Sequence, residues 1–188
     1  MLLSELARPT RHELIGRDVE VKELIYNSRK VKNGDVFCCI VGTFADGHKY
    51  AQQAVDAGAA ALVVERKLDI DVPQILVGDT RIAMAEMAAA YYGYPSREMQ
   101  MIGVTGTNGK TSTTYMLKAI AERMGKKVGL IGTIRNMIGD IIIDTERTTP
   151  ESVDLQRILR QMKDEKVDVV IMEVSSHSLD QKRVHGIE

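Results

Sequence analysis

The residues best suited to chemistry lie together in the stretch GVTGTNGKTS, residues 103–112. Gly106 and Gly109 would let backbone N–H groups approach a phosphate closely, because glycine has no side chain in the way. Lys110 can neutralise the charge of a β- or γ-phosphate, and the hydroxyl of Thr111 can reach a magnesium ion. This combination predicts a binding site for ATP and Mg²⁺, with Lys110 in a catalytic role.

The stretch departs from the usual phosphate-loop pattern. The usual form, G-x-x-x-x-G-K-[ST], requires glycine where this chain has Val104, and the glycines fall instead at 103, 106 and 109. A strand is predicted over 101–105 and a helix over 110–124, which is the context that a phosphate loop requires. We therefore favour a phosphate loop over a glycine-rich turn with a solvated lysine. A dinucleotide-binding loop fits less well, because no G-x-G-x-x-G is present.

A second candidate follows a buried strand farther along the chain. The apolar run from Val167 to Met172 predicts a parallel strand, and Glu173 comes directly after it. Because the carboxyl ends of parallel strands meet at one edge of a sheet, this carboxylate should lie near the phosphate loop. We predict that Glu173 is catalytic and that it and Thr111 are magnesium ligands, directly or through water. The alternative is an exposed glutamate at a strand end.

Alternating strands and helices must hold these residues in place, which is typical of α/β architecture. Strands are expected over 35–41, 61–64, 74–77, 101–105, 127–131 and 167–172, helices over 50–58, 80–92, 110–124 and 151–163, and a hairpin over 134–144. A turn at 93–96 marks the predicted domain boundary. We expect a small N-terminal α/β domain, residues 1–97, followed by a Rossmann-like parallel-sheet domain, residues 98–188.

Composition excludes some classes of protein. The 188 residues carry a formal net charge of -1 and 4% aromatic residues with no Trp, which argues against nucleic-acid binding. Cys38 and Cys39 are adjacent and would point to opposite faces of a strand, so they are expected to be small buried thiols. The first residues contain no apolar run long enough for a signal peptide or a membrane span. We expect a soluble, cytoplasmic protein.

Four stretches resemble the Mur ligases. Three are similar to the ATP-binding domain of that family: GVTGTNGKTST (103–113), RTTPES (147–152) and MEVSSHSLDQKRV (172–184). The fourth is similar to its N-terminal UDP-sugar domain: YNSRKVKNGDVFCCIVGTFADGHKYAQQA (26–54). The glycine spacing is the family's own version of the phosphate loop. The resemblance covers nearly the whole chain and implies a UDP-MurNAc-binding domain followed by part of an ATP-binding ligase domain.

The resemblance implies an activity in peptidoglycan precursor synthesis. It is closest to the ligases that add a diamino acid to UDP-MurNAc-L-Ala-D-Glu. Such a ligase would use ATP and Mg²⁺ to convert the D-glutamate carboxylate into an acyl phosphate, which the amine of the diamino acid then attacks. The diamino acid could be meso-diaminopimelate or L-lysine, and the sequence leaves both open. A monomer is expected at full length.

The resemblance also implies contacts residue by residue. Nucleotide contacts are implied for Gly106, Thr107, Asn108, Gly109, Lys110, Thr111 and Ser112. Contacts with UDP-MurNAc-dipeptide are implied for residues in both domains: Tyr26, Ser28, Thr43, Phe44 and Ala45 in the first, and Thr148, Thr149, Ser175, Gln181 and Arg183 in the second. Arg183 suits a carboxylate or a phosphate, because its planar guanidinium can donate two parallel hydrogen bonds.

Other interpretations stay open. A phosphate-loop kinase or simple NTPase would explain the loop and Glu173 but not the N-terminal domain. Folylpolyglutamate and cyanophycin synthetases share the loop and the acyl-phosphate chemistry but resemble the N-terminal half less well. A non-catalytic nucleotide-sugar-binding module is a further alternative. We interpret His177 as a structural or positioning residue, because its spacing from Ser175 does not by itself create a nucleophile–base pair.

We also expect this chain to be part of a longer protein. Three parallel strands in the second domain would leave uncovered sheet edges and too few helices to bury both faces. Nothing in the sequence provides a pocket for the attacking amine or a lid over an acyl phosphate. We therefore expect partial substrate binding and no ligation by these residues alone.

Overall fold

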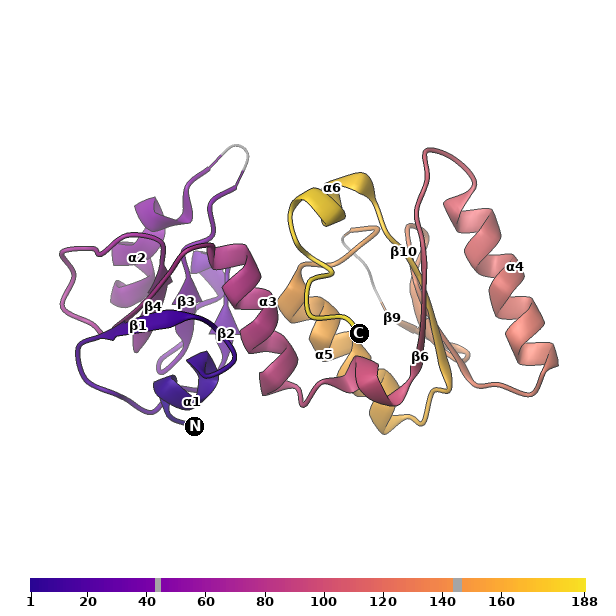
Figure 1. Cartoon of the computed structure of the whole chain (residues 1–188), viewed down its shortest axis with the longest axis horizontal. Helices are drawn as coiled ribbons and strands as arrows, with labels where there is room; N and C mark the ends of the chain where they lie inside the picture. The colour runs from indigo at the N-terminus through magenta and orange to yellow at the C-terminus, as the bar shows by residue number, and fades with distance from the viewer. Residues whose placement is uncertain (43–44, 144–146) are drawn as a thin grey trace. The chain divides into compact units, whose positions relative to one another are not determined.

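The computed structural model describes residues 1–42, 45–143 and 147–188 (Figure 1). These residues form two compact units, Met1–Tyr91 and Tyr92–Glu188. The predicted substrate contacts Thr43 and Phe44 lie outside the described residues, as does the end of the hairpin predicted over 134–144.

The first unit is built on a five-stranded sheet. In chain order its strands are β1 (His12–Ile15), β2 (Leu24–Ile25), β3 (Val36–Cys38), β4 (Ala61–Val64) and β5 (Gln74–Val77). They lie in the order β1-β5-β4-β3-β2, with β2 to β5 parallel and β1 antiparallel to β5. The strands predicted over 61–64 and 74–77 are confirmed, and the strand predicted over 35–41 is shorter. β1 and β2 were not predicted.

Helices and turns complete the first unit. They are α1 (Leu3–Ala7), α2 (Ala51–Asp56), α3 (Thr80–Tyr91) and two 3₁₀ turns, η1 (Ser28–Lys30) and η2 (Gly47–Tyr50). The Asp79 carboxylate accepts hydrogen bonds from the backbone N–H groups of Arg81 and Ile82, so it caps α3. α2 packs against the sheet through a cluster of buried side chains that includes Phe37, Ala51, Ala54 and Leu62.

The second unit also contains a five-stranded sheet. Its strands are β6 (Gln100–Val104), β7 (Val128–Ile131), β8 (Asn136–Ile138), β9 (Ile141–Ile143) and β10 (Val169–Glu173). Their order is β6-β10-β7-β8-β9, so the last strand in the chain lies between the first two. β6, β10 and β7 are parallel, as predicted, and the β8–β9 hairpin continues the sheet in antiparallel fashion. The sheet is therefore mixed, and one edge of the parallel set is paired with the hairpin rather than uncovered.

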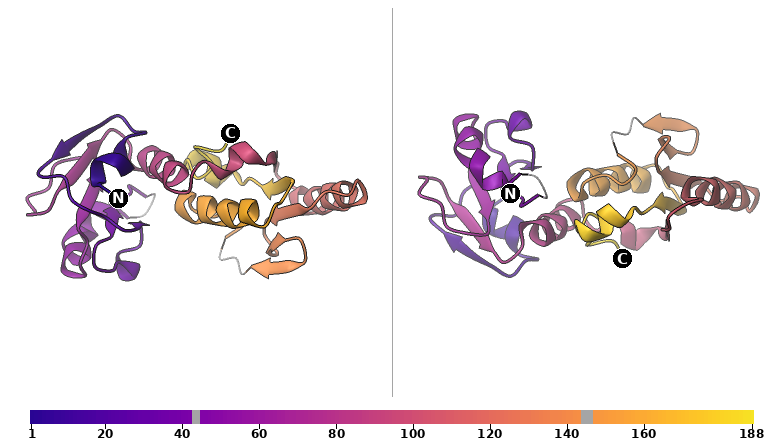
Figure 2. Two further views of the ribbon diagram at one scale, coloured as in Figure 1. Left: turned by 90° about the horizontal axis from the view of Figure 1, so that it is seen from below. Right: turned by 90° about the horizontal axis from the view of Figure 1, so that it is seen from above.

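Two helices pack on opposite faces of this second sheet (Figure 2). They are α4 (Lys110–Arg123) and α5 (Ser152–Asp164), and the short α6 (Ser176–Asp180) and the 3₁₀ turn η3 (Pro95–Glu98) complete the unit. Because side chains alternate along a strand, Val128 and Leu130 face α4, whereas Ile131 faces α5. One long helix lies on each face, and together they bury β7 and β10, whereas the outer strand β6 stays partly exposed, in line with the expectation of too few helices. α6 was not predicted.

Two further expectations concern the cysteines and the membrane. Cys38 and Cys39 are both buried free thiols, and burial raises the pKa of the Cys39 thiol to about 12. They therefore behave as the small buried side chains that their position in the sequence predicts. Among the described residues, no helix is both long enough and apolar enough to cross a bilayer.

Candidate functional site

The predicted phosphate loop lies between the end of β6 and the start of α4. Gly106 and Gly109 have backbone φ angles of 146° and 81°, values that L-residues with a side chain rarely adopt. α4 begins at Lys110, so the N–H groups of its first turn have no partners within the helix. Such N–H groups at the start of a helix favour a bound anion. The local geometry thus suits a site for nucleotide phosphates.

The Lys110 side chain folds over this loop. Its ammonium group donates a hydrogen bond to the carbonyl oxygen of Gly106 at 2.7 Å and lies 3.5 Å from the carbonyl oxygen of Thr107. An ammonium group has three N–H donors, so at least one is left for a phosphate oxygen. The positive charge is therefore held at the loop rather than extended into solvent.

Glu173 lies at the sheet edge that the sequence predicts for it. It is the last residue of the central strand β10, and in the strand register it pairs with Val104, the residue before the loop. Glu173 is only 1% exposed, and its Oε2 accepts a hydrogen bond from the Thr111 hydroxyl at 3.0 Å. The two predicted metal ligands are thus in direct contact, and the alternative of a solvated glutamate at a strand end is wrong.

Thr133 is a third member of this cluster, and sequence reasoning missed it. It follows β7, which is the other parallel neighbour of β10. Its backbone N–H donates to Glu173 Oε1 at 3.0 Å, and its hydroxyl donates to Oε2 at 3.0 Å. Both oxygens of the buried carboxylate therefore have partners, as a buried charge requires. A polar residue two positions after a predicted parallel strand was the available signal.

The chemistry of this cluster fits magnesium. In proteins Mg²⁺ is usually held by one or two carboxylates, with substrate phosphates and water completing its ligands. Thr111 and Glu173 bring a hydroxyl and a carboxylate to the loop that would hold the phosphates. They are the residues that would hold the ion, and the ion would neutralise phosphate charge there.

Two predicted substrate residues, Thr148 and Thr149, are joined to the same cluster. The hydroxyl oxygens of Thr148 and Thr133 lie 3.1 Å apart. The Thr149 hydroxyl donates to the backbone carbonyl of Glu173 at 2.8 Å and accepts from the backbone N–H of Ser175 at 3.2 Å. Hydrogen bonds thus bring Thr148, Thr149 and Ser175 to the sheet edge that carries Glu173.

Arg183 and Gln181 lie beside Thr149. Arg183 donates from Nη1 to the carbonyl oxygen of Thr149 at 3.1 Å and from Nη2 to Gln181 Oε1 at 2.6 Å. Its Nε lies 3.0 Å from Oε1 of Glu151, a buried carboxylate that also pairs with Arg147. The protein itself therefore fixes the position of the Arg183 guanidinium. Glu151 had not been singled out from the sequence.

His177 takes a different position from these residues. It lies exposed on α6, and no side-chain hydrogen bond or ion pair of His177 is found among the described residues. Ser175, two positions earlier, accepts a hydrogen bond from the backbone N–H of Ser178 and so caps α6. The neighbouring serine is thus a cap rather than the partner of a catalytic histidine.

A pocket of about 470 Å³ lies beside the end of the phosphate loop. Its walls come from the first turns of α4, from the segment after β7 and from β8, and they consist of Thr111, Ser112, Tyr115, Ile134, Arg135 and Met137. A molecule bound there would touch the predicted nucleotide residues Thr111 and Ser112 and also Arg135.

In the first unit, the described candidates follow neighbouring parallel strands. Tyr26 follows β2, and Ala45 lies in the segment after β3, so both are at the carboxyl edge of the sheet. The Ser28 hydroxyl, at the start of η1, donates to Gln53 Oε1 at 3.3 Å. The carbonyl oxygen of Ala45 accepts from the backbone N–H of Gly42 at 2.8 Å. The sheet thus gathers Tyr26, Ser28 and Ala45 at one edge.

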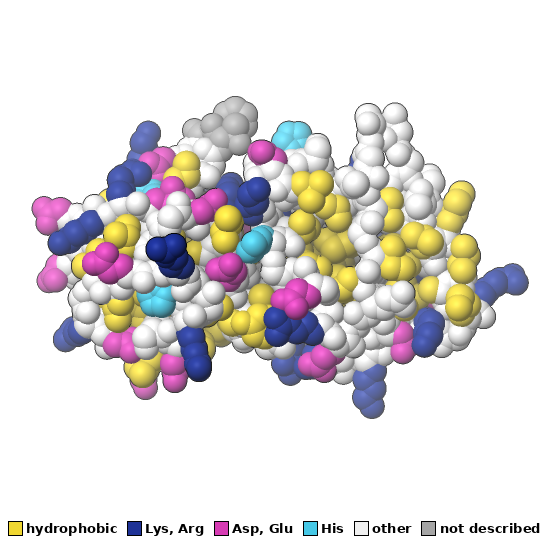
Figure 3. All heavy atoms as spheres, viewed as in Figure 1, with side chains coloured by type: hydrophobic (Ala, Val, Ile, Leu, Met, Phe, Trp, Pro, Cys, Tyr) yellow, Lys and Arg dark blue, Asp and Glu magenta, His cyan; other side chains and the backbone are white. Residues whose placement is uncertain are grey.

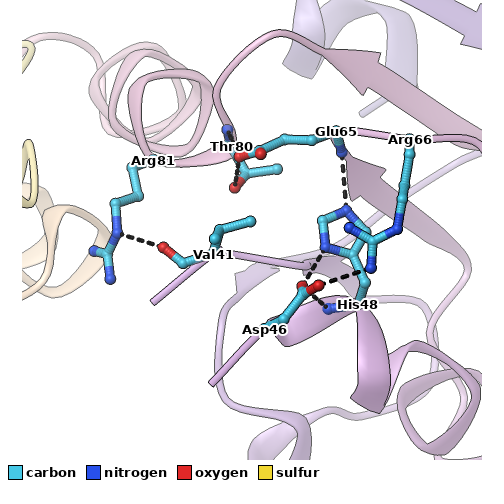
Figure 4. A network of polar contacts seen from close by, with 7 residues as sticks. All are labelled: Val41, Asp46, His48, Glu65, Arg66, Thr80 and Arg81. Carbon is cyan, nitrogen blue, oxygen red and sulfur yellow. Dashed lines mark hydrogen bonds and ion pairs between the residues drawn. The ribbon is translucent and has the colours of Figure 1, made fainter. Parts of the chain in front are cut away.

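A polar network holds the segment that follows Ala45 (Figure 4). Asp46 accepts a hydrogen bond from Arg66 at 2.7 Å and pairs with His48 Nδ1 at 2.6 Å. His48 Nε2 accepts from the backbone N–H of Glu65 at 2.9 Å, so the ring proton sits on Nδ1 and is donated to Asp46. Glu65 in turn accepts from the backbone N–H and the hydroxyl of Thr80. The hydrogen bond from Arg66, with smaller contributions from His48, holds the pKa of Asp46 well below its usual range.

The other side of the segment is tied to α3. Arg81 Nε donates to the carbonyl oxygen of Val41 at 3.1 Å, and Val41 forms an isolated antiparallel bridge with Asp46. Val41 and Asp46 are therefore held by side chains from α3 and from the residues that follow β4. Sequence reasoning found no role for Asp46, His48 or Arg66, because they come together only in the folded unit.

Two family models match the chain. One, described as Mur ligase family, catalytic domain, matches residues 20–92. The other, described as Mur ligase middle domain, matches residues 104–188. The two matches fall in different units and between them cover most of the sequence.

Close relatives carry one common name, UDP-N-acetylmuramoyl-L-alanyl-D-glutamate--2,6-diaminopimelate ligase. The protein from Clostridium botulinum is 53% identical over 174 residues, which is 90% of this chain and 36% of the relative. The protein from Geobacillus kaustophilus is 51% identical over 173 residues, which is 92% of this chain and 35% of the relative. The chain therefore spans little more than a third of the length of these curated relatives.

Solved structures of Mur ligases superpose on this chain. A structure with the same ligase name superposes with a TM-score of 0.74 at 26% identity, covering 88% of this chain and 34% of that one. A MurF structure from Acinetobacter baumannii superposes with a TM-score of 0.63 at 23% identity, covering 92% of this chain and 35% of that one, and shows a shared fold.

Proposed function

This chain belongs to the Mur ligase family, and from that membership we propose that it is part of an ATP-dependent ligase that adds meso-diaminopimelate to UDP-MurNAc-L-Ala-D-Glu. The single observation that carries the proposal is the hydrogen-bonded cluster of Thr111, Glu173 and Thr133 next to the phosphate loop. It joins the residues proposed for ATP and magnesium to the loop proposed for the substrate.

Each unit has a separate proposed role. Residues 1–97 would bind the UDP end of the substrate, and residues 98–188 would supply the first part of the ATP-binding domain. The family match over 20–92 and the position of Tyr26, Ser28 and Ala45 at one sheet edge support the first role. The match over 104–188 and the loop geometry support the second.

The proposed reaction has two steps. An oxygen of the substrate's D-glutamate carboxylate attacks the γ-phosphorus of ATP, the bond to ADP breaks, and an acyl phosphate forms. The amine of meso-diaminopimelate then attacks the carbonyl carbon, inorganic phosphate leaves with the bonding electron pair, and the amine loses a proton. We also propose that the full-length ligase is a monomer and acts in the cytoplasm.

The residues of this chain meet the electrostatic demands of the first step. A carboxylate and a polyphosphate repel each other, so the site must hold both and screen their charges. Lys110, already held at the loop, would donate to phosphate oxygens. Thr111 and Glu173 would hold the magnesium ion, which supplies further positive charge at the phosphates.

Substrate positioning would fall to the residues at the same edge. Thr149 is hydrogen-bonded to the Glu173 carbonyl and to the backbone N–H of Ser175, and Thr148 contacts Thr133, so all three lie where they could contact the substrate. Arg183, fixed by Glu151 and Gln181, offers a preorganised guanidinium beside them. Preorganisation of this kind lowers the entropy cost of aligning a carboxylate with the phosphorus.

The test uses the ligase extended to the length of its relatives. It is incubated with ATP, Mg²⁺, UDP-MurNAc-L-Ala-D-Glu and either meso-diaminopimelate or L-lysine, and the tripeptide product and released phosphate are measured. We expect one tripeptide and one phosphate per ATP consumed with meso-diaminopimelate, and no product with L-lysine. Product with L-lysine alone would contradict the proposed amino acid, and no tripeptide with either would contradict the ligase.

A further inference from the structure

We infer that Thr133 is a positioning residue that sets which oxygen of Glu173 faces the magnesium ion and links that carboxylate to Thr148. The inference rests on the proposed function, because it concerns the residues proposed there for Mg²⁺ and for the UDP-MurNAc substrate. Thr133 itself belongs to neither set, and no sequence pattern predicted a role for it.

Glu173 Oε1 is held in place by the backbone. It accepts from the backbone N–H of Thr133 at 3.0 Å. A side-chain carbon on the preceding residue, Gly132, would lie 2.4 Å from Oε1, so the carboxylate fills the space that this glycine leaves. The backbone N–H of Gly132 donates to the buried Asn136 side chain at 3.2 Å, which fixes the segment. Oε1 therefore has little freedom to turn.

Glu173 Oε2 has a different kind of partner. It accepts from two hydroxyl groups, those of Thr111 and Thr133, at 3.0 Å each. A hydroxyl hydrogen rotates easily, whereas a backbone N–H cannot leave its plane. Oε2 is therefore the oxygen that can exchange its Thr111 partner for a cation, directly or through water. Thr133 would continue to donate to both carboxylate oxygens.

The hydrogen bond between Thr133 and Thr148 has a definite direction. Thr133 has one hydroxyl hydrogen, and the ionised carboxylate is a stronger acceptor than the Thr148 hydroxyl. Because Thr133 donates to Glu173, its 3.1 Å contact with Thr148 is a hydrogen bond that Thr148 donates. The lone pairs of Thr148 then remain for a ligand, so Thr148 would accept a hydrogen bond from an N–H or O–H group of the substrate.

Removal of the Thr133 hydroxyl should weaken the binding of magnesium. Thr133→Val keeps the shape of the side chain and the backbone N–H but removes both hydroxyl contacts. Loss of a partner that orients a metal ligand typically weakens metal binding by about 10–100-fold. Thr133→Ser keeps the hydroxyl and is the matched control. Thr148→Val removes the link to the substrate loop but leaves both contacts of Thr133 with Glu173.

The experiment is a calorimetric titration of ADP into this chain at a series of Mg²⁺ concentrations. We expect Thr133→Val to need about tenfold more Mg²⁺ for half of the Mg²⁺-dependent gain in ADP affinity, and Thr133→Ser and Thr148→Val to stay within about twofold of the parent chain. An unchanged Mg²⁺ requirement in a folded Thr133→Val variant would overturn the inference.

A second measurement needs no variant and covers the case in which Thr133→Val does not fold. The backbone amide signal of Thr133, followed by NMR in the ADP-bound parent chain, should shift on addition of Mg²⁺, because its acceptor gains a cation. If Mg²⁺ raises the affinity for ADP but leaves the Thr133 amide signal in place, the inference about Thr133 is overturned and the proposed function stands. If ADP binds the parent chain with no response to Mg²⁺, or not at all, the proposed function fails as well.

Discussion

At the scale of single residues, the site depends on the buried carboxylate of Glu173. Hydrogen bonds from Thr111 and from both donors of Thr133 satisfy its oxygens, and its backbone carbonyl accepts from Thr149. In a buried environment such bonds are stronger, and a missing partner is costly. The same carboxylate therefore stabilises the sheet edge and is the proposed ligand of the magnesium ion, so substitutions around it should affect both stability and metal binding.

Gly132→Ala tests this double role. The added carbon would lie 2.4 Å from Glu173 Oε1, so the carboxylate or the backbone after β7 must move. Overpacking of this kind costs typically about 1–3 kcal/mol. We expect a lower midpoint of urea unfolding and weaker Mg²⁺-dependent ADP binding. Gly78→Ala is the control, because a carbon there meets nothing within 4 Å. Equal unfolding midpoints for Gly132→Ala and the parent chain would argue against the close approach.

At the scale of elements, the parallel strands bring distant residues together. β10 enters between β6 and β7, so the loop after β6, Glu173 at the end of β10 and Thr133 after β7 meet at one edge. In the first unit, β2, β3 and β4 gather Tyr26, the segment around Asp46 and Glu65 in the same way. Both candidate sites are thus products of strand order more than of local sequence.

The Asp46 network predicts a pH dependence of the first unit's stability. The hydrogen bond from Arg66 lowers the pKa of Asp46 in the folded state. A carboxylate with a lowered folded pKa stabilises the fold above its unfolded pKa of about 3.9, and that contribution is lost as pH falls toward the folded pKa. Asp46→Asn should therefore lower the free energy of unfolding at pH 7. The difference in this free energy between the variant and the parent chain should shrink below about pH 4.

Urea unfolding at pH 7, 5, 4 and 3 measures this difference. Asp71→Asn removes an exposed carboxylate from the same unit and serves as the control for net charge. The explanation would be wrong if the gap between Asp46→Asn and the parent chain stayed constant from pH 7 to pH 3.

Much of the element layout could be predicted from the sequence, because several strands are continuous apolar runs between turn residues. β4 and β5 match their predicted residues for that reason. β1 was missed because His12 and Glu13 interrupt any apolar run, and β2 because two residues are too few to show a period. A local sequence pattern identifies a strand only when one or both of its faces are buried, because burial makes the residues on that face apolar.

The site was predictable in part. The phosphate loop and the position of Glu173 follow from glycine spacing and from the rule that parallel strands end at one edge. The roles of Thr133, Glu151 and His48 do not follow, because their partners lie far away in the sequence. Hydrogen bonds between distant loops depend on strand order and register, which no local pattern encodes.

At the scale of the whole molecule, the chain spans about a third of the length of its relatives, and its surface carries an apolar helix face (Figure 3). Met116, Ile120 and Met124, four residues apart along α4 and its end, are 66%, 57% and 72% exposed. Side chains at this spacing lie on one face of a helix. Contiguous apolar surface of this kind favours association in water.

We therefore predict concentration-dependent self-association of this chain through the α4 face. Ile120→Glu should place a charge in the middle of that face and shift the chain toward monomer. Sedimentation velocity over a hundredfold range of concentration measures the change. Lys126→Gln alters the net charge by the same amount outside the face and should leave association as it is. A parent chain that stays monomeric throughout this range would contradict the prediction.

Calorimetric titration of this chain with Mg²⁺·ATP tests whether the loop around Lys110 binds the phosphates of the nucleotide. Lys110 is held against the loop carbonyl oxygens and has a donor left for a phosphate. We predict measurable binding by the parent chain, no detectable binding by Lys110→Ala, and unchanged binding by Lys126→Ala, which removes an exposed lysine elsewhere. Equal affinities of the parent chain and Lys110→Ala for Mg²⁺·ATP would contradict the claim.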